Sequence, residues 1–450
     1  MRARGRGLGS VLLGPVLLGP VLVGPVLLGH ALLLPSPLLL PLPGRAAAAL
    51  PSPAATSSPG HQPRLSSTTG PPPRPSPVPI PRSAPASSRT LRPAANPVSL
   101  QIVVAEEGRF LAWPANQGLW SWDNGRELLV GYVNGPWVDK EEGHKIGSPQ
   151  TFQLARSLDG GRSWSRQAAD PPFSLEGEAG SPAQPIHFDD PDLAVRVLAD
   201  GGKEADQRLG RFYVSEDRGH HWQGPYRFQG LEREKSLRGL ILTSRTSYLV
   251  RGPASILVFL SARNPRLGKF NTRLDKTFVA ESLDGGRSFR FVSWVVPWSD
   301  GRRAVMPSSV DLGEAGLVTA LRRRDPRTGE QESNWIDAYG SSDDGRSWTF
   351  LSRVGETGQH NGNPPALTRL RDGRLACAWA DRDGQRMLLR LSDDGGRSWG
   401  PQRLIRSNPH SFDMGYPQLR QNDRGELVMI YYLATDERPH AYIEAALFRP

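Results

Sequence analysis

The stretch "SLDGGRSW" at residues 157–164 decides the fold, because near-copies of it return four times along the chain. We call these octapeptides boxes. Each has Ser, then Asp two residues later, Gly four residues later and an aromatic residue seven residues later. A pattern with this spacing that occurs five times in 450 residues indicates a repeat architecture. The other four copies are "SEDRGHHW" at 215, "SLDGGRSF" at 282, "SSDDGRSW" at 341 and "SDDGGRSW" at 392.

The sequence between the boxes alternates short strand patterns with turns. Long helical periodicity is missing throughout, and Gly- and Asp-rich turn signals such as "RDGRL" precede several apolar runs. β-branched and aromatic residues of this kind favour strands. The chain is therefore predicted to be all-β. The runs are "LVGYV", "ILVFL", "LVTAL", "LACAWA" and "LVMIYY".

The two ends of the repeat region complement each other. The distance between boxes suits a four-stranded unit, and the sequence after the last box provides only three more strands. The missing strand is supplied by "SLQIVVAEE" at 99–107, ahead of the first unit. Closure of this kind removes the open edges of a ring of sheets. The sequence thus predicts a six-bladed β-propeller over residues 98–450.

The first hundred residues have a different composition. Residues 1–49 combine a basic start, a long apolar run and small residues near Ala46, which is typical of a secretory signal peptide. Prolines, among them Pro15, Pro20, Pro25, Pro35 and Pro37, interrupt the apolar run. A stable membrane span is therefore not expected, although an uncleaved N-terminus would anchor the chain. Residues 50–97 are rich in Pro and Ser and are predicted to be a disordered linker. A secreted or extracytoplasmic protein is expected; the alternative is a mis-assigned start codon.

Charge and cysteine content exclude further classes. Residues 1–100 hold nine Arg and no Lys, Asp or Glu, whereas the rest of the chain is close to neutral. The basic pI therefore gives no support to a nucleic-acid surface on the folded part. The single cysteine, Cys377, excludes an intrachain disulfide and lies in an apolar strand pattern, which favours a buried packing role. A monomer is expected.

The box S-x-D-x-G-x-x-W resembles the Asp-box, or BNR repeat, of the sialidase (neuraminidase) superfamily. The similarity covers residues 100–450 and implies a propeller whose boxes close turns on one face, with the substrate site on the other face. In a box, Asp accepts backbone N–H bonds, Gly permits a positive φ and the aromatic packs inward. The boxes are thus predicted to be structural.

The resemblance also implies a site. Tyr416 in "DMGYPQL" matches the family's tyrosine nucleophile, and Asp139 in "PWVDKEEGH" lies where the acid/base is kept. Two parts of the pattern have no match: the first triad arginine is replaced by Ala112, and no Glu stands near "AVMPSS" to assist the tyrosine. Arg303 or Arg109 are candidate replacements for the arginine. The predicted substrate-binding residues are Arg303, Arg322, Arg323, Arg382, Asp190, Asn363 and Trp113.

Three functions are compatible with these residues. The first is an exported sialidase-like exo-glycoside hydrolase acting on a terminal sugar of a glycan. The second is a carbohydrate-binding propeller without turnover, and the third is a glycosidase or lyase of different specificity on the same scaffold. No cofactor is expected, because Walker and dinucleotide glycine patterns are missing. No metal site is expected, because the histidines lack paired ligand spacing.

Overall fold

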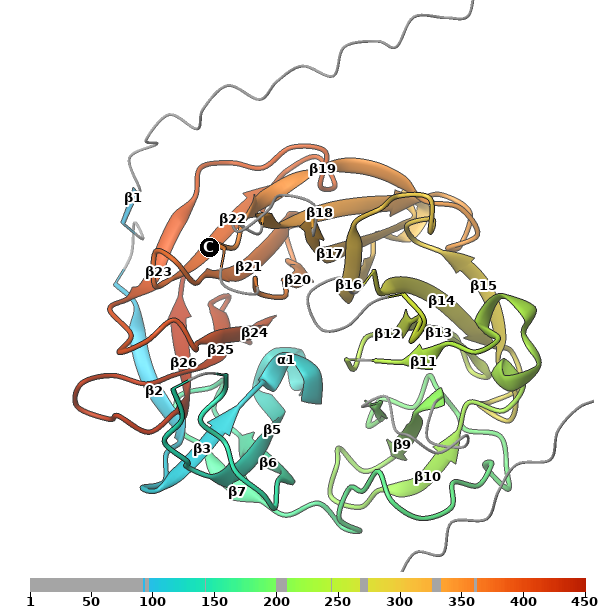
Figure 1. The fold of residues 1–450 in the computed structure, drawn as a ribbon, viewed down its shortest axis with the longest axis horizontal. Helices are drawn as coiled ribbons and strands as arrows, with labels where there is room; N and C mark the ends of the chain where they lie inside the picture. The colour runs from blue at the N-terminus through green and yellow to red at the C-terminus, as the bar shows by residue number, and fades with distance from the viewer. Residues whose placement is uncertain are drawn as a thin grey trace, which may run out of the picture. The chain divides into compact units, whose positions relative to one another are not determined.

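The computed structural model describes residues 92–93, 97–141, 143–199, 209–243, 245–267, 274–325, 333–359 and 362–450 (Figure 1). Strands dominate this part of the chain, which confirms the all-β prediction. The predicted signal peptide lies outside the described residues. So does the predicted linker, apart from Pro97 and the two-residue strand β1 (Arg92–Pro93), which pairs in parallel with β23 (Arg403–Ser407).

The strands form antiparallel sheets of sequential neighbours, and these sheets follow one another round a common centre (Figure 1). The first sheet contains β3 (Arg109–Ala112), β4 (Leu119–Trp122), β5 (Glu127–Pro136), β6 (Thr151–Ser157) and β7 (Ser165–Gln167). The second contains β8 (Ala194–Leu198), β9 (Arg211–Ser215) and β10 (Gln223–Arg227).

A nine-stranded sheet comes next along the chain and consists of two antiparallel groups joined by one parallel bridge, Lys276 to Ala304. Its first group is β11 (Ile241–Leu242), β12 (Tyr248–Gly252), β13 (Ser255–Arg263), β14 (Lys276–Ser282) and β15 (Arg290–Trp294). Its second group is β16 (Arg303–Asp311), β17 (Leu317–Asp325), β18 (Ser333–Ser341) and β19 (Thr349–Glu356).

The remaining two sheets bring the ends of the strand region together. One contains β20 (Ala366–Arg369), β21 (Leu375–Asp381), β22 (Arg386–Ser392), β23 and β1. The other contains β24 (Gly415–Gln421), β25 (Leu427–Leu433), β26 (Tyr442–Phe448) and β2 (Ser99–Val104). Ser99 of β2 pairs with Leu447 of β26, so the expected pairing of the two ends is confirmed.

Helical segments are short. The α-helix α1 (Pro114–Gln117) begins with Pro, whose fixed φ suits the first helical position, and the sequence analysis did not predict it. No helix within the described residues is long and apolar enough to cross a membrane. Among the described residues, the 3-10 helices are η1 (Asp123–Gly125), η3 (Leu231–Arg233), η4 (Lys235–Leu237) and η5 (Gly313–Ala315).

The boxes form turns held by their own side chains. In the first, Ser157 Oγ accepts a hydrogen bond from Gly161 N at 2.8 Å, while Asp159 accepts from Ser163 N at 2.9 Å and Ser163 Oγ at 2.6 Å. Equivalent bonds from the Gly amide to the Ser hydroxyl recur in the other four boxes. These contacts give the box Asp a role in the turn, as predicted.

Candidate functional site

A cleft of about 260 Å³ opens at the strand ends opposite the boxes. The register of β5 and β6 shows the two ends, because Leu128 pairs with box residue Ser157 and Asn134 pairs with Thr151 six residues away. The cleft lies at the second end. Aromatic and amide side chains, which suit the faces and hydroxyls of a sugar, form much of its wall. They are Trp113, Asn116, Gln117, Gln150, Phe152 and Tyr416, with His144 beside them.

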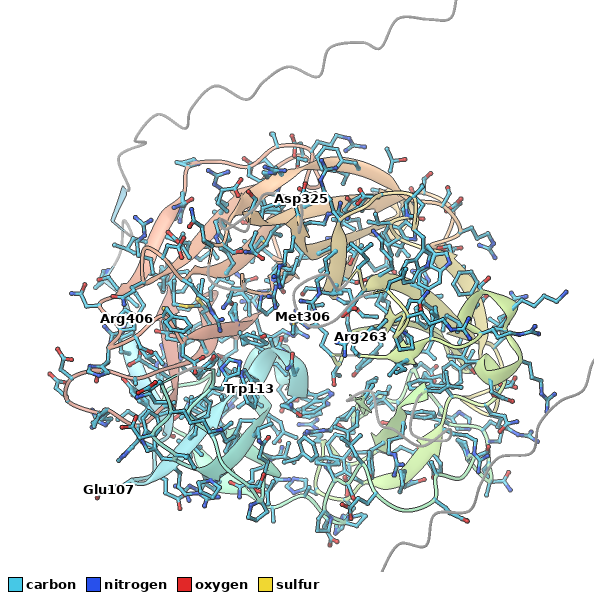
Figure 2. All side chains as sticks on the ribbon, in the orientation of Figure 1. Glu107, Trp113, Arg263, Met306, Asp325 and Arg406 are labelled. Atoms are coloured by element: carbon cyan, nitrogen blue, oxygen red, sulfur yellow. The ribbon has the colours of Figure 1, made fainter. Side chains whose placement is uncertain are left out.

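Three residues around the centre adopt a left-handed backbone immediately before a proline. They are Trp113, Met306 and Tyr416, with φ of 59°, 58° and 51°. Figure 2 shows Trp113 and Met306 near the middle of the molecule. This conformation is unfavourable for bulky side chains and persists only where the surrounding structure enforces it. Such strain is concentrated at functional sites, and two of the three residues line the cleft.

Tyr416 is positioned through its backbone. Asn363 is fully buried, its Oδ1 accepts a hydrogen bond from Tyr416 N at 2.9 Å, and its Nδ2 donates to Met414 O at 3.0 Å. Gly415 lies against Asn363, and a Cβ at Gly415 would approach Asn363 Nδ2 to 2.5 Å. Asn363 therefore holds the segment that carries Tyr416, and the structure does not place it in the cleft wall.

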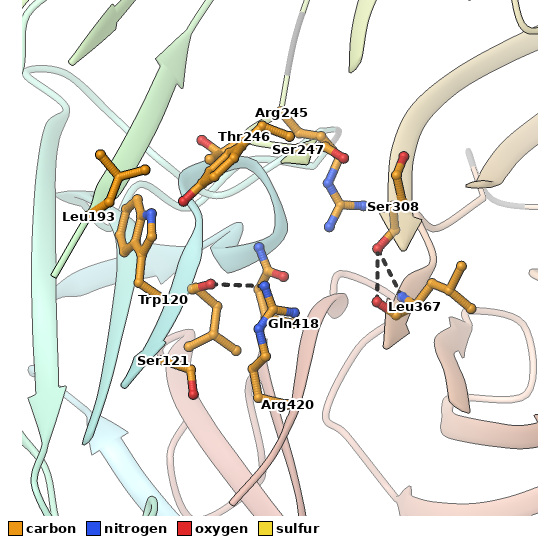
Figure 3. Close-up of a pocket in the computed structure, with 13 residues that line it drawn as sticks. Trp120, Ser121, Leu193, Arg245, Thr246, Ser247, Ser308, Leu367, Gln418 and Arg420 are labelled. Atoms are coloured by element: carbon orange, nitrogen blue, oxygen red, sulfur yellow. Dashed lines mark hydrogen bonds between the residues drawn. The ribbon is translucent and has the colours of Figure 1, made fainter. Parts of the chain in front are cut away.

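Buried arginines surround Tyr416. Arg382 lies over its ring, with the guanidinium carbon 5.7 Å from the ring centroid. Arg322 is 2% exposed and donates to Met306 Sδ, and Tyr416 contributes to its electrostatic environment. Arg245 is buried, lines a different cavity from the cleft (Figure 3) and also interacts electrostatically with Tyr416. Burial lowers the pKa of Arg245 and of Arg322 to about 9.

A histidine and an aspartate form a pair beside the tyrosine. His144 Nδ1 lies 2.9 Å from Asp413 Oδ1, and the Asp413 carboxyl also accepts a hydrogen bond from Tyr432. Burial alone would raise the pKa of Asp413, but the hydrogen bond from His144 and the charge of Arg382 hold it below its usual value. An ionised Asp413 orients the imidazole. The edge of His144 packs against Trp113, with ring centroids 5.0 Å apart.

One predicted residue lies apart from this group, and another lies near Arg322 at its edge. Asp139 is 85% exposed, forms an ion pair with Lys145 at 2.6 Å, and is not among the residues that line the cleft. The hydrogen bond and charge of Lys145 lower its pKa. Arg303 pairs with the buried carboxylate of Asp275 at 3.1 Å. Its positive charge also contributes to lowering the pKa of Arg322. Arg109, its suggested alternative, donates to Asn134.

The structure places Arg323 on the opposite side of β17 from Arg322. Successive strand residues point to opposite faces, so neighbours in sequence are separated by the strand itself. Arg323 pairs with Asp300 at 2.7 Å and with Asp337 at 3.4 Å, in a separate cleft lined by the segment after β15 and by β18 and β19. The expectation that Arg323 joins the central site is thereby corrected.

Asp190 lies at the box end of the molecule. It precedes β8, whose first residue Ala194 pairs with box residue Ser215, and its Oδ1 accepts a hydrogen bond from Asp192 N at 2.8 Å. Asp190 was predicted to bind substrate, which requires a position at the cleft end of the strands. β8 pairs antiparallel with the box strand β9, so the residues that precede β8 lie at the box end instead. Asp190 is therefore corrected to a turn residue away from the cleft.

Sequence reasoning missed His144, Asp413 and Arg245 as site residues. His144 had been considered only as a metal ligand, and Asp413 stands three residues before Tyr416 in the motif already singled out. Arg245 lies in the break between β11 and β12, which no local pattern marks. Among the described residues, no group of three or more His, Cys, Asp or Glu side chains is placed to hold a metal ion.

Comparison with known proteins identifies the family. The model of the BNR repeat-like domain matches residues 176–429, which is more than half of the chain. The chain belongs to the BNR repeat-like family. The BNR repeat-like match covers the boxes at 215, 282, 341 and 392 and ends within β25. No curated protein matches the sequence.

Solved structures agree with this assignment. A protein of unknown function from Dyadobacter fermentans matches with a TM-score of 0.56 and 17% identity, over 78% of this chain and 98% of that chain. The GH93 α-L-arabinofuranosidase of Fusarium graminearum, solved with arabinobiose, matches with a TM-score of 0.51 and 12% identity, over 79% and 98%. At these identities the likeness establishes a shared all-β fold of propeller type.

Proposed function

We propose that the chain is an exported glycoside hydrolase that removes a terminal sugar from a glycan, with Tyr416 as nucleophile. The observation that carries the proposal is the placement of Tyr416 in the cleft wall together with the His144–Asp413 pair. The arabinofuranosidase of similar fold, solved with arabinobiose, supports a carbohydrate ligand. The membership in the BNR repeat-like family supports the same scaffold.

The proposed reaction has two steps. Tyr416 Oη attacks the anomeric carbon and releases its phenol proton to a solvent water, while the bond to the leaving oxygen breaks and His144 gives its Nε2 proton to that oxygen. A second water then attacks the anomeric carbon of the tyrosyl adduct and gives one proton to His144, the bond to the tyrosine oxygen breaks, and that oxygen takes back a proton from solvent water. Asp413 keeps His144 oriented throughout. We assign the proton to His144 rather than to Asp139, because Asp139 points into solvent and is paired with Lys145.

A specific observation favours a second candidate, carbohydrate binding without turnover. None of the described residues that line the cleft is Asp or Glu. Most glycosidases hydrolyse with a pair of carboxylates at the scissile bond, so a cleft wall of amides and aromatics also suits a binding module. The two functions differ in whether the Tyr416 oxygen is needed.

A panel of aryl glycosides tests the proposal on residues 98–450 and separates its substrate classes. The panel includes an aryl sialoside and an aryl α-L-arabinofuranoside, because the nearby arginines suit a carboxylate while the amides suit a neutral sugar. Tyr416→Phe should lower turnover by several orders of magnitude, and the control Tyr226→Phe, at a partly exposed tyrosine of β10, should leave it unchanged. Equal turnover by wild type and Tyr416→Phe contradicts the nucleophile.

A second pair of variants locates the acid. His144→Gln should lower kcat by about 10²–10⁴ on a poor leaving group and less on an aryl glycoside that needs little protonation. Asp139→Asn should have little effect. The reverse ranking would assign the acid to Asp139, as the family resemblance implies. Glycan binding without release by wild type would instead establish the binding module.

Export and ring closure belong to the same proposal. The pairing of β2 with β26, and the two antiparallel groups within the nine-stranded sheet, support six blades. A signal peptide over residues 1–49, a linker over 50–97 and a secreted monomer remain expectations from the sequence. N-terminal sequencing of the secreted protein should find a chain that begins after about residue 45, and an intact Met1 in the cytoplasm would overturn this part.

A further inference from the structure

The separate cleft that contains Arg323, which we call the outer cleft, has a volume of about 740 Å³. The segment between β15 and β16 lines one side of it, and β18 and β19 line the other. Figure 1 shows β15 and β19 on the outside of the ring of sheets. None of the described residues lines both the outer cleft and the cleft beside Tyr416. A cleft of this size is large enough to hold a ligand.

Two β-bulges bring three side chains of β19 onto the wall of the outer cleft. On β18, Trp335, Asp337 and Tyr339 stand at alternate positions and therefore share a face. Their partners on β19 are spaced more widely, because β19 carries one extra residue between each partner and the next. Bulges re-aim side chains in this way and are common next to functional sites. The opposed pairs, all of which line the outer cleft, are Trp335 with Glu356, Asp337 with Arg353, and Tyr339 with Phe350.

Arg353 and Glu356 present a donor beside an acceptor. The guanidinium carbon of Arg353 lies 4.5 Å from the centroid of the Trp335 ring, which fixes its position. Its nitrogen atoms lie 3.6 Å from Asp337 Oδ1 and 3.2 Å from Glu356 Oε1. The side chains of Arg353 and Glu356 are nevertheless 52% and 63% exposed, so both groups remain open to a ligand.

The charges that line the outer cleft are of mixed sign. Such a wall does not concentrate ions of one sign, as a cleft lined by a single sign of charge does. An anion needs donors and a cation needs acceptors, whereas a hydroxyl group both donates and accepts. The lining therefore favours a neutral ligand that is rich in hydroxyl groups. The pairs of opposite charge are Asp300 with Arg323, Asp325 with Arg302, and both Asp337 and Glu356 with Arg353.

Phe350 adds an apolar platform at one end of this row of side chains. It is 54% exposed, more than any other aromatic side chain in the described part of the chain. The ring of Tyr339 supports it in an edge contact, with centroids 5.8 Å apart and planes at 72°. An aromatic face beside polar groups suits a sugar ring, whose C–H face is apolar and whose rim carries hydroxyl groups.

We propose that the outer cleft binds a neutral oligosaccharide, with one sugar ring on Phe350 and hydroxyl groups of the next on Arg353 and Glu356. The row from Tyr339 to Trp335 is four strand residues long, which is about 14 Å and exceeds the length of one sugar ring. The ligand is therefore a chain of at least two sugars. Tyr416 takes no part in this site, so it stands or falls independently of the proposed hydrolase.

Calorimetric titration of the full chain with hexasaccharides tests the proposal. The neutral probes are arabinohexaose, cellohexaose and xylohexaose, and the charged probes are hexagalacturonate and the chitosan hexamer. All proteins carry Tyr416→Phe, so that the proposed hydrolysis does not consume a probe. At least one neutral hexamer should bind more tightly than both charged ones, and adding Phe350→Ala should weaken its binding at least tenfold.

The control Leu283→Ala removes an apolar side chain of similar exposure, 58%, from the turn of the third box. It should bind the neutral hexamer as tightly as the parent does. Three results would each overturn the outer site: no binding of any neutral hexamer, tighter binding of a charged hexamer, or equal affinity of the Phe350→Ala and Leu283→Ala proteins.

Crystals soaked in the neutral hexamer locate the site directly. Density for a sugar ring is expected against Phe350, with hydroxyl groups within hydrogen-bond distance of Arg353 and Glu356. Sugar density confined to the cleft beside Tyr416 refutes the outer site and leaves the proposed hydrolase standing. Density confined to the outer cleft supports this site without supporting the hydrolase, so the two proposals are told apart.

Discussion

The last box provides a sharp test of whether these motifs are structural, through Asp394→Ala. Asp394 accepts three hydrogen bonds, from Ser392 Oγ at 2.8 Å, Ser398 N at 2.9 Å and Ser398 Oγ at 2.6 Å. Each bond contributes about 1 kcal/mol, and the exposed donors regain water when the carboxylate is removed. The free energy of unfolding should therefore fall by about 1–3 kcal/mol.

The neighbouring residue is the matched control. Asp393 is exposed, stands next to Asp394 and makes none of these three bonds, so Asp393→Ala should change stability by less than about 0.5 kcal/mol. Urea unfolding of both variants, with unchanged m-values, measures the difference. Equal stability of the two variants would refute the structural role. A stable Asp394→Ala that has lost turnover or glycan binding would place the box in the functional site.

Three further predictions concern stability and reactivity. The hydrogen bond from the Ser398 hydroxyl lowers the pKa of Asp394 from its usual 3.8 to about 2. The ionised carboxylate therefore stabilises the folded state fully above about pH 4, and this contribution is lost as the pH falls toward 2. Between pH 5 and pH 2, the midpoint of urea unfolding should fall less steeply in Asp394→Ala than in the wild type. Burial raises the pKa of the Cys377 thiol, so a thiol reagent should modify it only after unfolding, and rapid native reaction would contradict its core position. Urea unfolding should show a larger loss of stability for Gly316→Ala than for Gly373→Ala. Both glycines have φ of +89°, but only a Cβ at Gly316 would collide with a neighbour, the carbonyl oxygen of Ser341. Equal losses in the free energy of unfolding would contradict this steric explanation.

Much of the fold could be predicted because its signals are local. Each box fixes a turn through contacts within eight residues, and the alternation of apolar runs with turns specifies strands. The pairing of residues 99–104 with the last strand could be predicted because the last unit has only three strands of its own and needs a fourth from elsewhere in the chain. This inference depends on the number of strands and not on any particular side-chain contact. The short helix α1 was missed because four residues are too few to show a helical period.

The site was harder to predict because it depends on register and direction. The sequence singled out Tyr416, Arg322 and Arg382 because they stand at recognisable strand ends, and the structure places these three side chains near one another. Arg323 was assigned with Arg322, although one step along a strand reverses the face. Asp190 was misplaced because the second sheet has no inner strand ahead of β8 within the described residues. β8 therefore runs away from the box end, opposite to the direction expected for the first strand of a blade. No sequence pattern specifies such a change.

The central claim is that Tyr416 forms a covalent bond with a sugar, and trapping that adduct tests it most directly. Wild type would be incubated with activated fluoro-glycosides, of the sialoside and arabinofuranoside types, and digested with trypsin, which releases the peptide of residues 407–420. Fragmentation should place one sugar on Tyr416 rather than on Asp413, and Tyr416→Phe should show no adduct. A sugar on any other residue, or turnover of these glycosides without a tyrosyl adduct, would contradict the account.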